Sequence, residues 1–323
     1  MLIRFFKDNL PFPLYAVLPV LTFLLWIPGF LAFKQVEPAY QMPLYNTLSS
    51  ILFYFPNLAW FLSVGLIYFE AILLNAYVNK FEILTIRSNL PALFFVIITS
   101  AFSSFQLFHP AIISNLLLIL AFGRICSIYR QDYVFAYTFD VGALIALASL
   151  FYFPAIIFFP VAWFSLAVIR PFIWREYVIS LLGMLTPYGL LITYYLFTDK
   201  LTYLFKEVYY IPYLDLLKFD LGNEKYLYLV FGVLSIIGVP RLISISGLSV
   251  VRTQNLLKVI GFAFFIGICA FVLFRNTFSY TFMLLAFPLA VLLANYFITV
   301  IKQWIAEVVF IILILIAVFQ YIY

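Results

Sequence analysis

The sequence predicts an all-α, polytopic membrane protein, built as a single transmembrane domain over residues 1–323. Of the 323 residues, 67% are hydrophobic and 10% are charged, whereas soluble domains have about 45–50% and about 25%. At roughly 20 residues a span, this length allows about 11 spans. The run VVFIILILIAVF at 308–319 does not alternate in polarity, which excludes a bacterial-type β-barrel. We therefore expect a bundle of transmembrane helices in the inner membrane of the cell.

Charges and clusters of Pro, Gly and Asn divide the chain into successive apolar segments. In order, these are 13–33, 57–78, 90–107, 110–129, 138–153, 154–169, 177–198, 226–246, 257–274, 278–301 and 304–323. The first segment follows the charges of Arg4 and Lys7, and no small-residue cleavage site comes after it. It therefore reads as a retained first span rather than a cleaved signal peptide.

The distribution of basic residues predicts the orientation. With the N-terminus inside, the inner loops and inner span ends carry most of the 18 Lys and Arg residues. They are Arg4, Lys7, Lys80, Arg87, Arg124, Arg130, Arg170, Arg175, Arg241, Arg252, Lys258 and Lys302. Because short cytoplasmic loops are enriched in Lys and Arg, we expect the N-terminus inside and the C-terminus outside.

Two outer segments differ from the short inner loops and are the candidate active-site elements. Segment 34–56 holds a carboxylate, several tyrosines and an amphipathic run that could lie along the membrane surface. Segment 198–225 mixes charges with tyrosines. Since binding and catalytic residues concentrate on loops, we expect a polar working site on this side.

The composition excludes several functional classes. Cys126 and Cys269 lie in apolar runs, and His109 is the single histidine, so we predict no disulfide framework and no cysteine or histidine metal site. A divalent cation held by carboxylates is left possible. The net charge of +5 is spread through short loops, which does not make a nucleic-acid-binding patch. We find no nucleotide-binding loop or serine–histidine constellation.

Glu37 is the most informative single residue. It lies a few positions beyond the first predicted span, in the string VEPAY, where a carboxylate would sit at interface depth. Nearness to the apolar core raises a carboxyl pKa, which suits a general base. The alternative is an ordinary solvated acid just outside a span.

The string EPAY also carries a resemblance. An acidic residue followed by a tyrosine and an interfacial helix in the first outer loop resembles the GT-C glycosyltransferases, which use polyprenyl-phosphate sugar donors. The stretches 108–125, 139–160 and 175–191 are similar to the hairpins of short, close-set spans in those enzymes. The resemblance covers about the first 200 residues. The opening RFFKDN and the general run of spans also resemble an uncharacterised family of Bacteroidota membrane proteins.

The GT-C resemblance implies an inverting transfer of a sugar or oligosaccharide at the outer face of the membrane. Glu37, with Glu in place of the usual Asp, would be the general base, and Tyr40 matches the tyrosine of the motif. The loop that would carry a second acid offers His109 instead. The departing lipid phosphate needs positive charge or strong donors. The candidates for binding it or the sugar are Tyr45, His109, Lys200, Lys206, Tyr209, Tyr210 and Arg275, and Arg275 is the only arginine on the outer side.

Three ionisable residues fall inside or at the start of predicted spans. Because an unpaired charge in the membrane is costly, we predict that Glu70 pairs with Arg124, with Asp140 as the alternative partner of that arginine. Such residues can form a proton path or can simply neutralise one another between packed helices.

Two other functions are open at this point. A transporter or lipid flippase would need a polar path across the midplane, and Glu70, Arg124 and the prolines within the spans motivate it. A non-catalytic subunit would pack its aromatic surfaces against partner membrane proteins, and Glu37 would then be replaceable. Otherwise the expected partners are membrane lipid and the lipid-linked donor.

Overall fold

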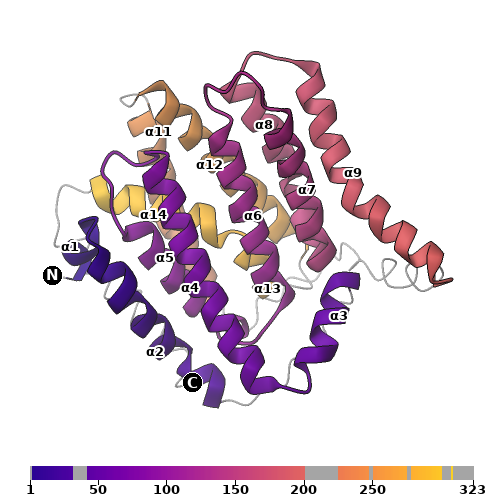
Figure 1. The fold of residues 1–323 in the computed structure, drawn as a ribbon. Coiled ribbons are helices and arrows are strands. Elements are labelled where there is room, and N and C mark those ends of the chain that lie inside the picture. The colour runs from indigo at the N-terminus through magenta and orange to yellow at the C-terminus, as the bar shows by residue number, and fades with distance from the viewer. Residues whose placement is uncertain are drawn as a thin grey trace.

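A computed structural model describes residues 2–31, 42–200, 225–246, 250–274, 278–299 and 307. This part of the chain consists of helices and their connections, with no strand (Figure 1). The elements are α1 (Leu2–Lys7), η1 (Pro13–Val17), α2 (Leu18–Leu31), α3 (Pro43–Leu52), α4 (Pro56–Lys80), α5 (Leu90–Ser100), η2 (Ser103–Gln106), α6 (Pro110–Ser127), α7 (Phe135–Phe151), η3 (Phe153–Phe158), α8 (Phe159–Ile169), α9 (Trp174–Phe197), α11 (Lys225–Ser246), α12 (Val251–Leu273), α13 (Phe278–Met283) and α14 (Ala286–Thr299). The predicted all-α class is confirmed for these residues.

Five stretches in the described residues are long and apolar enough to cross a membrane. They are Pro13–Leu31, Pro56–Lys80, Pro110–Ser127, Trp174–Phe197 and Val251–Leu273. Four other apolar helical stretches in the described part of the chain have only 10–17 residues: Leu90–Ser100, Phe135–Phe151, Phe153–Ile169 and Ala286–Thr299. The predicted segment 90–107 forms only the 11-residue α5 and a 3-10 turn. An α-helix of this length spans about 16 Å, against about 30 Å of hydrocarbon, so α5 does not cross a membrane by itself.

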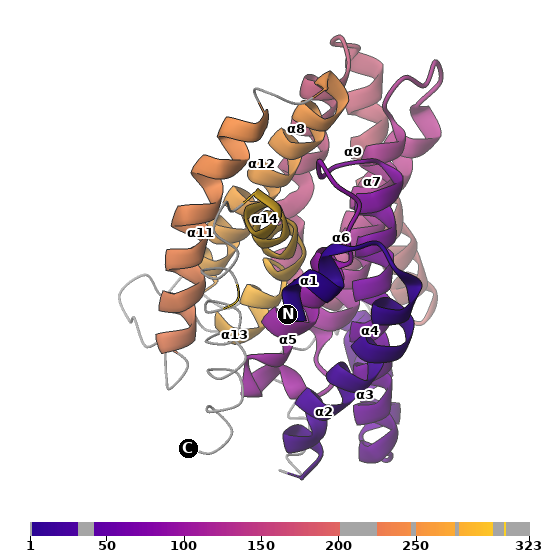
Figure 2. The same cartoon turned by 90° about the vertical axis from the view of Figure 1, so that its left-hand side faces the viewer.

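The short helices α5 and α14 make the centre of the protein. Every residue of α5 is buried, as expected for a helix that is apolar all round. Phe94 of α5 packs on Phe297 of α14, with ring centroids 4.6 Å apart. Figure 2 shows α14 almost end-on, inside the ring made by the longer helices. The core therefore consists of short helices enclosed by longer ones.

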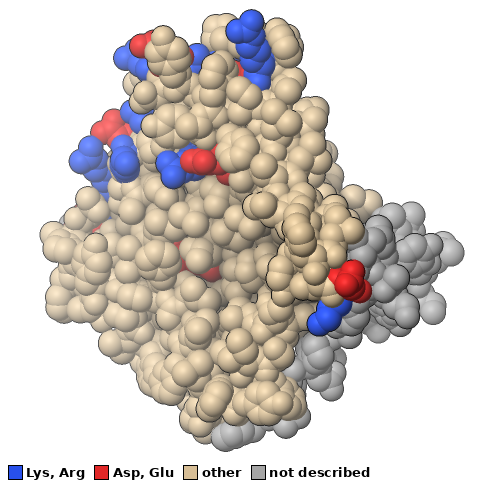
Figure 3. Space-filling model, turned by 45° about the vertical axis from the view of Figure 1, so that its right-hand side comes forward, with Lys and Arg blue, Asp and Glu red and all other residues tan. Residues whose placement is uncertain are grey.

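Basic residues gather at one end of the bundle, which we call the basic face: Lys80, Arg87, Arg124, Arg130, Arg170, Arg175 and Arg252. The guanidinium group of Arg252, at the start of α12, lies 5.6 Å from the ring centroid of Phe81 and 5.5 Å from that of Tyr129. These contacts join the loops after α4 and α6 to the first turn of α12. Figure 3 shows most charged side chains of the visible surface near its top, above a broad band with few charges.

The opposite end is formed around α3, and we call it the α3 face: Met42, Tyr45, Phe108, Phe151 and Phe153. Met42, Tyr45 and Phe108 are buried in a small cluster apart from the main core, and the other two pack against it. The amphipathic run predicted in 34–56 thus contains a helix, α3, which buries Tyr45 and Leu52 and exposes Thr47 and Ile51. This helix also forms one wall of the cavity described below.

Candidate functional site

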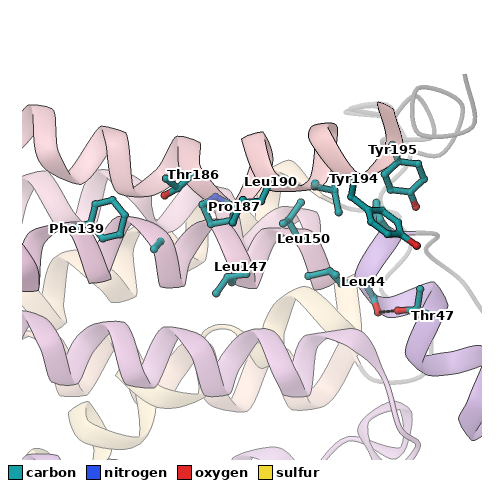
Figure 4. Close-up of a pocket in the computed structure, with 13 residues that line it drawn as sticks. Leu44, Thr47, Phe139, Leu147, Leu150, Thr186, Pro187, Leu190, Tyr194 and Tyr195 are labelled. Carbon is teal, nitrogen blue, oxygen red and sulfur yellow. Dashed lines mark hydrogen bonds between the residues drawn. The ribbon is translucent and has the colours of Figure 1, made fainter. Parts of the chain in front are cut away.

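An apolar groove with a volume of about 690 Å³ lies between α3, α7 and α9 (Figure 4). On α7 the lining residues are spaced three or four apart and therefore share one face of the helix. The groove is lined by Pro43, Leu44, Thr47, Phe139, Ala143, Leu147, Leu150, Thr186, Pro187, Leu190, Leu191, Tyr194 and Tyr195. None of these side chains is charged. We refer to this cavity as the groove.

Two glycines explain how α7 and α9 approach each other beside the groove. A Cβ atom on Gly142 would overlap the carbonyl oxygen of Ser180, and one on Gly183 would overlap the carbonyl oxygen of Phe139. The two backbones therefore touch at this crossing, as small residues allow between membrane helices. Beyond it α9 leans away from α7 toward its C-terminal end (Figure 1). The groove occupies the resulting space, and α3 closes one side of it.

Pro187 shapes α9 at the level of the groove. A proline inside a helix has no N–H to donate to the carbonyl four residues earlier, which here belongs to Gly183. The hydroxyl of Thr186 donates to that carbonyl instead, at 2.8 Å. The helix thus continues through Pro187, and the proline ring lines the groove.

Three of the four hydroxyl groups that line the groove gather at one end, and the fourth, that of Thr186, is bonded to the Gly183 carbonyl within α9. Thr47, Tyr194 and Tyr195 lie together at the end near α3, whereas Phe139 lies at the far end (Figure 4). The hydroxyl of Thr47 donates to the carbonyl of Leu44 at 2.9 Å. An apolar channel with a hydroxyl-bearing mouth fits a molecule that has a hydrocarbon chain and a polar head.

Two predicted substrate-binding residues meet on the other side of α3. Tyr45 is 1% exposed, and its hydroxyl donates to the carbonyl of Phe108 at 3.2 Å. The neighbouring His109 is 2% exposed and stacks on Tyr280, with ring centroids 4.8 Å apart. Within the described part of the chain, neither ring nitrogen of His109 has a hydrogen-bond partner. The structure therefore leaves one imidazole with both its polar atoms unused next to α3.

Burial decides the charge of His109. It lowers the pKa of His109 to about 3, because desolvation disfavours the charged imidazolium. Burial likewise raises the pKa of the Tyr45 hydroxyl. At neutral pH, His109 is therefore a neutral hydrogen-bonding group, and it cannot supply the positive charge expected of it for a phosphate.

The other predicted site residues divide into two groups. Lys200 is exposed just beyond the end of α9, where its backbone N–H donates to the carbonyl of Tyr195 at 3.0 Å. Outside the described residues lie Glu37, Tyr40, Lys206, Tyr209, Tyr210 and Arg275. Among the residues that the structure describes, no group of three or more His, Cys, Asp and Glu could hold a metal ion.

The predicted pairing of Glu70 with Arg124 is wrong. Arg124 pairs with Asp140, its alternative partner, at 3.3 Å, and Glu70 accepts a hydrogen bond from Asn115 at 2.8 Å. The positions of these residues along the helix axes explain why Glu70 does not pair with Arg124. Tyr77 of α4 lies against Gly123 of α6, and the two helices run in the same direction, so Glu70, seven residues before Tyr77, lies level with the region of Asn115. Arg124 lies nine residues beyond Asn115 on α6, which is about 13 Å along the helix at 1.5 Å a residue.

Sequence reasoning missed the groove and Asn115. Phe139, Ala143, Leu147 and Leu150 do carry a helical spacing, but apolar residues at that spacing also face lipid or a packed core. Gly142 would have been the available signal, because a glycine in an apolar helix often marks a close approach. Asn115 is a polar residue within a predicted span, and this could have marked it as a candidate partner of Glu70.

Comparison with known proteins gives a family but no activity. A family model described as a family of unknown function, DUF6427, matches residues 41–323. No curated protein and no solved structure matches the chain. Because the match covers most of the chain and includes α3 and the whole groove, the protein belongs to the DUF6427 family.

Proposed function

We propose that the protein is a membrane transferase that takes a sugar or oligosaccharide from a polyprenyl-phosphate donor at the outer face of the inner membrane. In this proposal the α3 face is the outer face and the basic face is cytoplasmic. The N-terminus is then inside and the C-terminus outside, with about 11 apolar segments in or at the membrane.

The observation that carries the proposal is the groove. Its volume of about 690 Å³ lies within the about 300–1,000 Å³ common for small-molecule sites. The apolar residues along α7 and α9 suit a prenyl chain, and the hydroxyls of Thr47, Tyr194 and Tyr195 at one end suit a phosphate or sugar. A lipid-linked donor has this distribution of polarity.

The position of Glu37 in the chain is compatible with a role at this mouth. Pro43 lines the groove, and Glu37 precedes it by six residues, which can reach at most about 20 Å when extended. We propose Glu37 as the general base that takes the proton of the acceptor hydroxyl while the lipid phosphate leaves. Lys200, Lys206 and Arg275 are the proposed sources of positive charge for that phosphate.

Neutral groups complete the proposed site. His109 would offer one donor and one acceptor to a hydroxyl or phosphate oxygen of the substrate. Tyr40, Tyr45, Tyr209 and Tyr210 are proposed as further hydroxyl donors or as rings that stack on the sugar.

The polar residues of α4 favour a transferase over a transporter. From Glu70 toward the basic face, the described part of α4 continues with Asn75 and Asn79, which donate hydrogen bonds to Asn89 and to the Ser88 carbonyl. Toward the α3 face the next buried polar side chain is Ser63, and its hydroxyl is bonded to a carbonyl of its own helix. A transport path would need polar groups in both directions.

A complementation experiment tests the transferase proposal. A deletion strain is complemented with wild type, with Glu37→Gln or with Glu82→Gln, and cell-surface glycans and glycoproteins are profiled. Glu82 is the matched control because its carboxylate pairs with Arg87 at the basic face, with both side chains exposed. We expect wild type and Glu82→Gln to restore the glycans and Glu37→Gln to fail. Full restoration of the glycans by Glu37→Gln would show that Glu37 is not the general base and would favour a non-catalytic subunit.

A further inference from the structure

A carboxyl group and an amide meet in the middle of the bundle, on helices that do not line the groove. Glu70 of α4 and Asn115 of α6 are both 0% exposed. The Asn115 Nδ2 group donates to Glu70 Oε2 at 2.8 Å. Among the described residues no ion pair includes Glu70, and the nearest predicted cation, Arg124, is held by Asp140.

Two oxygen atoms of this pair have no hydrogen-bond partner among the residues that the structure describes. They are Glu70 Oε1 and Asn115 Oδ1. An ionised carboxylate has only acceptors, whereas a primary amide has one donor side and one acceptor side. An ionised Glu70 can therefore satisfy the donor of Asn115 but never its acceptor.

A protonated carboxyl group is complementary to the amide. Its C=O oxygen accepts the amide N–H, and its O–H group can donate to the amide oxygen. A single proton on Glu70 Oε1 thus turns both unpartnered oxygens into members of a satisfied pair. It also removes an uncompensated negative charge from the membrane core.

We propose that Glu70 holds a proton and forms a reciprocal acid–amide pair with Asn115, so that the α4–α6 contact is a proton-binding site in the core of the bundle. The site is independent of the transferase proposal, since it shares no residue with the groove or with the α3 face. Gln is the stable mimic of the protonated side chain, because its amide presents the same donor and acceptor.

Infrared difference spectroscopy on the purified full-length protein tests the protonation directly. Spectra of wild type and Glu70→Gln are subtracted at a pH at which surface carboxyl groups are ionised. We expect wild type to show the C=O stretching band of a protonated carboxylic acid and Glu70→Gln to lack it. Asp140→Asn is the matched control and should remove only carboxylate bands, because Asp140 is paired with Arg124. Loss of carboxylate bands in Glu70→Gln would overturn the proposal.

Thermal unfolding tests the reciprocity of the pair. We expect Glu70→Gln to keep the wild-type midpoint and Glu70→Leu to lower it by about 4 °C or more, because Asn115 is left with an unsatisfied buried amide. The double variant Glu70→Leu/Asn115→Leu should regain part of that loss, because both polar groups are gone. A midpoint for Glu70→Gln as low as that of Glu70→Leu would show that the charge, and not the proton, is needed.

Discussion

The α5–α14 centre and α9 are built from predominantly apolar helices but have opposite surroundings. All residues of α5 are buried, whereas the buried residues of α9 are only Glu176, Ser180, Gly183 and Pro187. Those four recur at helical spacing and form one narrow stripe. Apolar composition therefore does not decide whether a helix is enclosed or open to its surroundings. In α9, small residues and a proline set where it touches α7 and where it leaves room for the groove.

The largest expected effect is a difference in the free energy of unfolding between a substitution in the α5–α14 centre and one on α9. Phe94→Ala should lower the free energy of unfolding by about 3–5 kcal/mol, because it removes a ring from a closely packed core. Leu185→Ala on the exposed side of α9, where the side chain is 54% exposed, should change it by less than about 0.5 kcal/mol. Denaturation of the purified variants in detergent measures both. Equal losses would contradict the assignment of α5 as the core.

A second substitution tests whether the close contact between α7 and α9 at Gly142 stabilises the protein. Gly142→Leu should destabilise the protein by about 1–3 kcal/mol or more, because the side chain has to displace the backbone of α9. Gly189→Leu is the matched control, since a Cβ atom there meets no atom of the described residues within 4 Å. If the two variants are equally stable, the helices do not depend on close contact at Gly142.

The buried histidine at the α3 face predicts a pH dependence. The pKa of His109 is about 3 in the folded protein and 6.5 in the unfolded chain, so below pH 6.5 the unfolded state binds a proton that the folded state does not. Stability should therefore fall as the pH is lowered from 6.5 toward 3. His109→Phe keeps a stacking ring and should show a smaller fall over this range. Unfolding free energies of both proteins against pH provide the comparison, and identical slopes would contradict a buried neutral imidazole.

The smallest effect is expected at the basic face. Arg124 and Asp140 have side chains that are 50% and 39% exposed, and exposed pairs contribute about 0–1 kcal/mol. Asp140→Asn should thus lower stability by less than about 1 kcal/mol, and salt should reduce the difference further. A loss as large as that of Phe94→Ala would show that this pair is part of the core.

The sequence alone predicts the bounds of those helices whose ends carry a charged residue or a proline. It does not predict which helices contact one another. The segments 57–78 and 177–198 correspond to Pro56–Lys80 and Trp174–Phe197, because Pro56, Lys80 and Arg175 mark the ends. The segment 278–301 is broken into α13 and α14 at Leu284 and Leu285, and the signal for that break is Pro288 in the first turn of α14. Helix depth and rotation are set by tertiary packing, and for that reason the partner of Glu70 and the groove could not be read from one chain.

The central claim is that the groove holds the hydrocarbon chain of a phosphate-bearing lipid. The most direct measurement is the binding of radiolabelled farnesyl phosphate to the purified protein in lipid nanodiscs, with wild type, Ala143→Phe and Gly189→Phe. Both variants introduce the same ring, but only Ala143 lines the groove. We predict that Ala143→Phe weakens binding by about tenfold or more and that Gly189→Phe binds like wild type. Equal binding by all three proteins would contradict the groove as the lipid site.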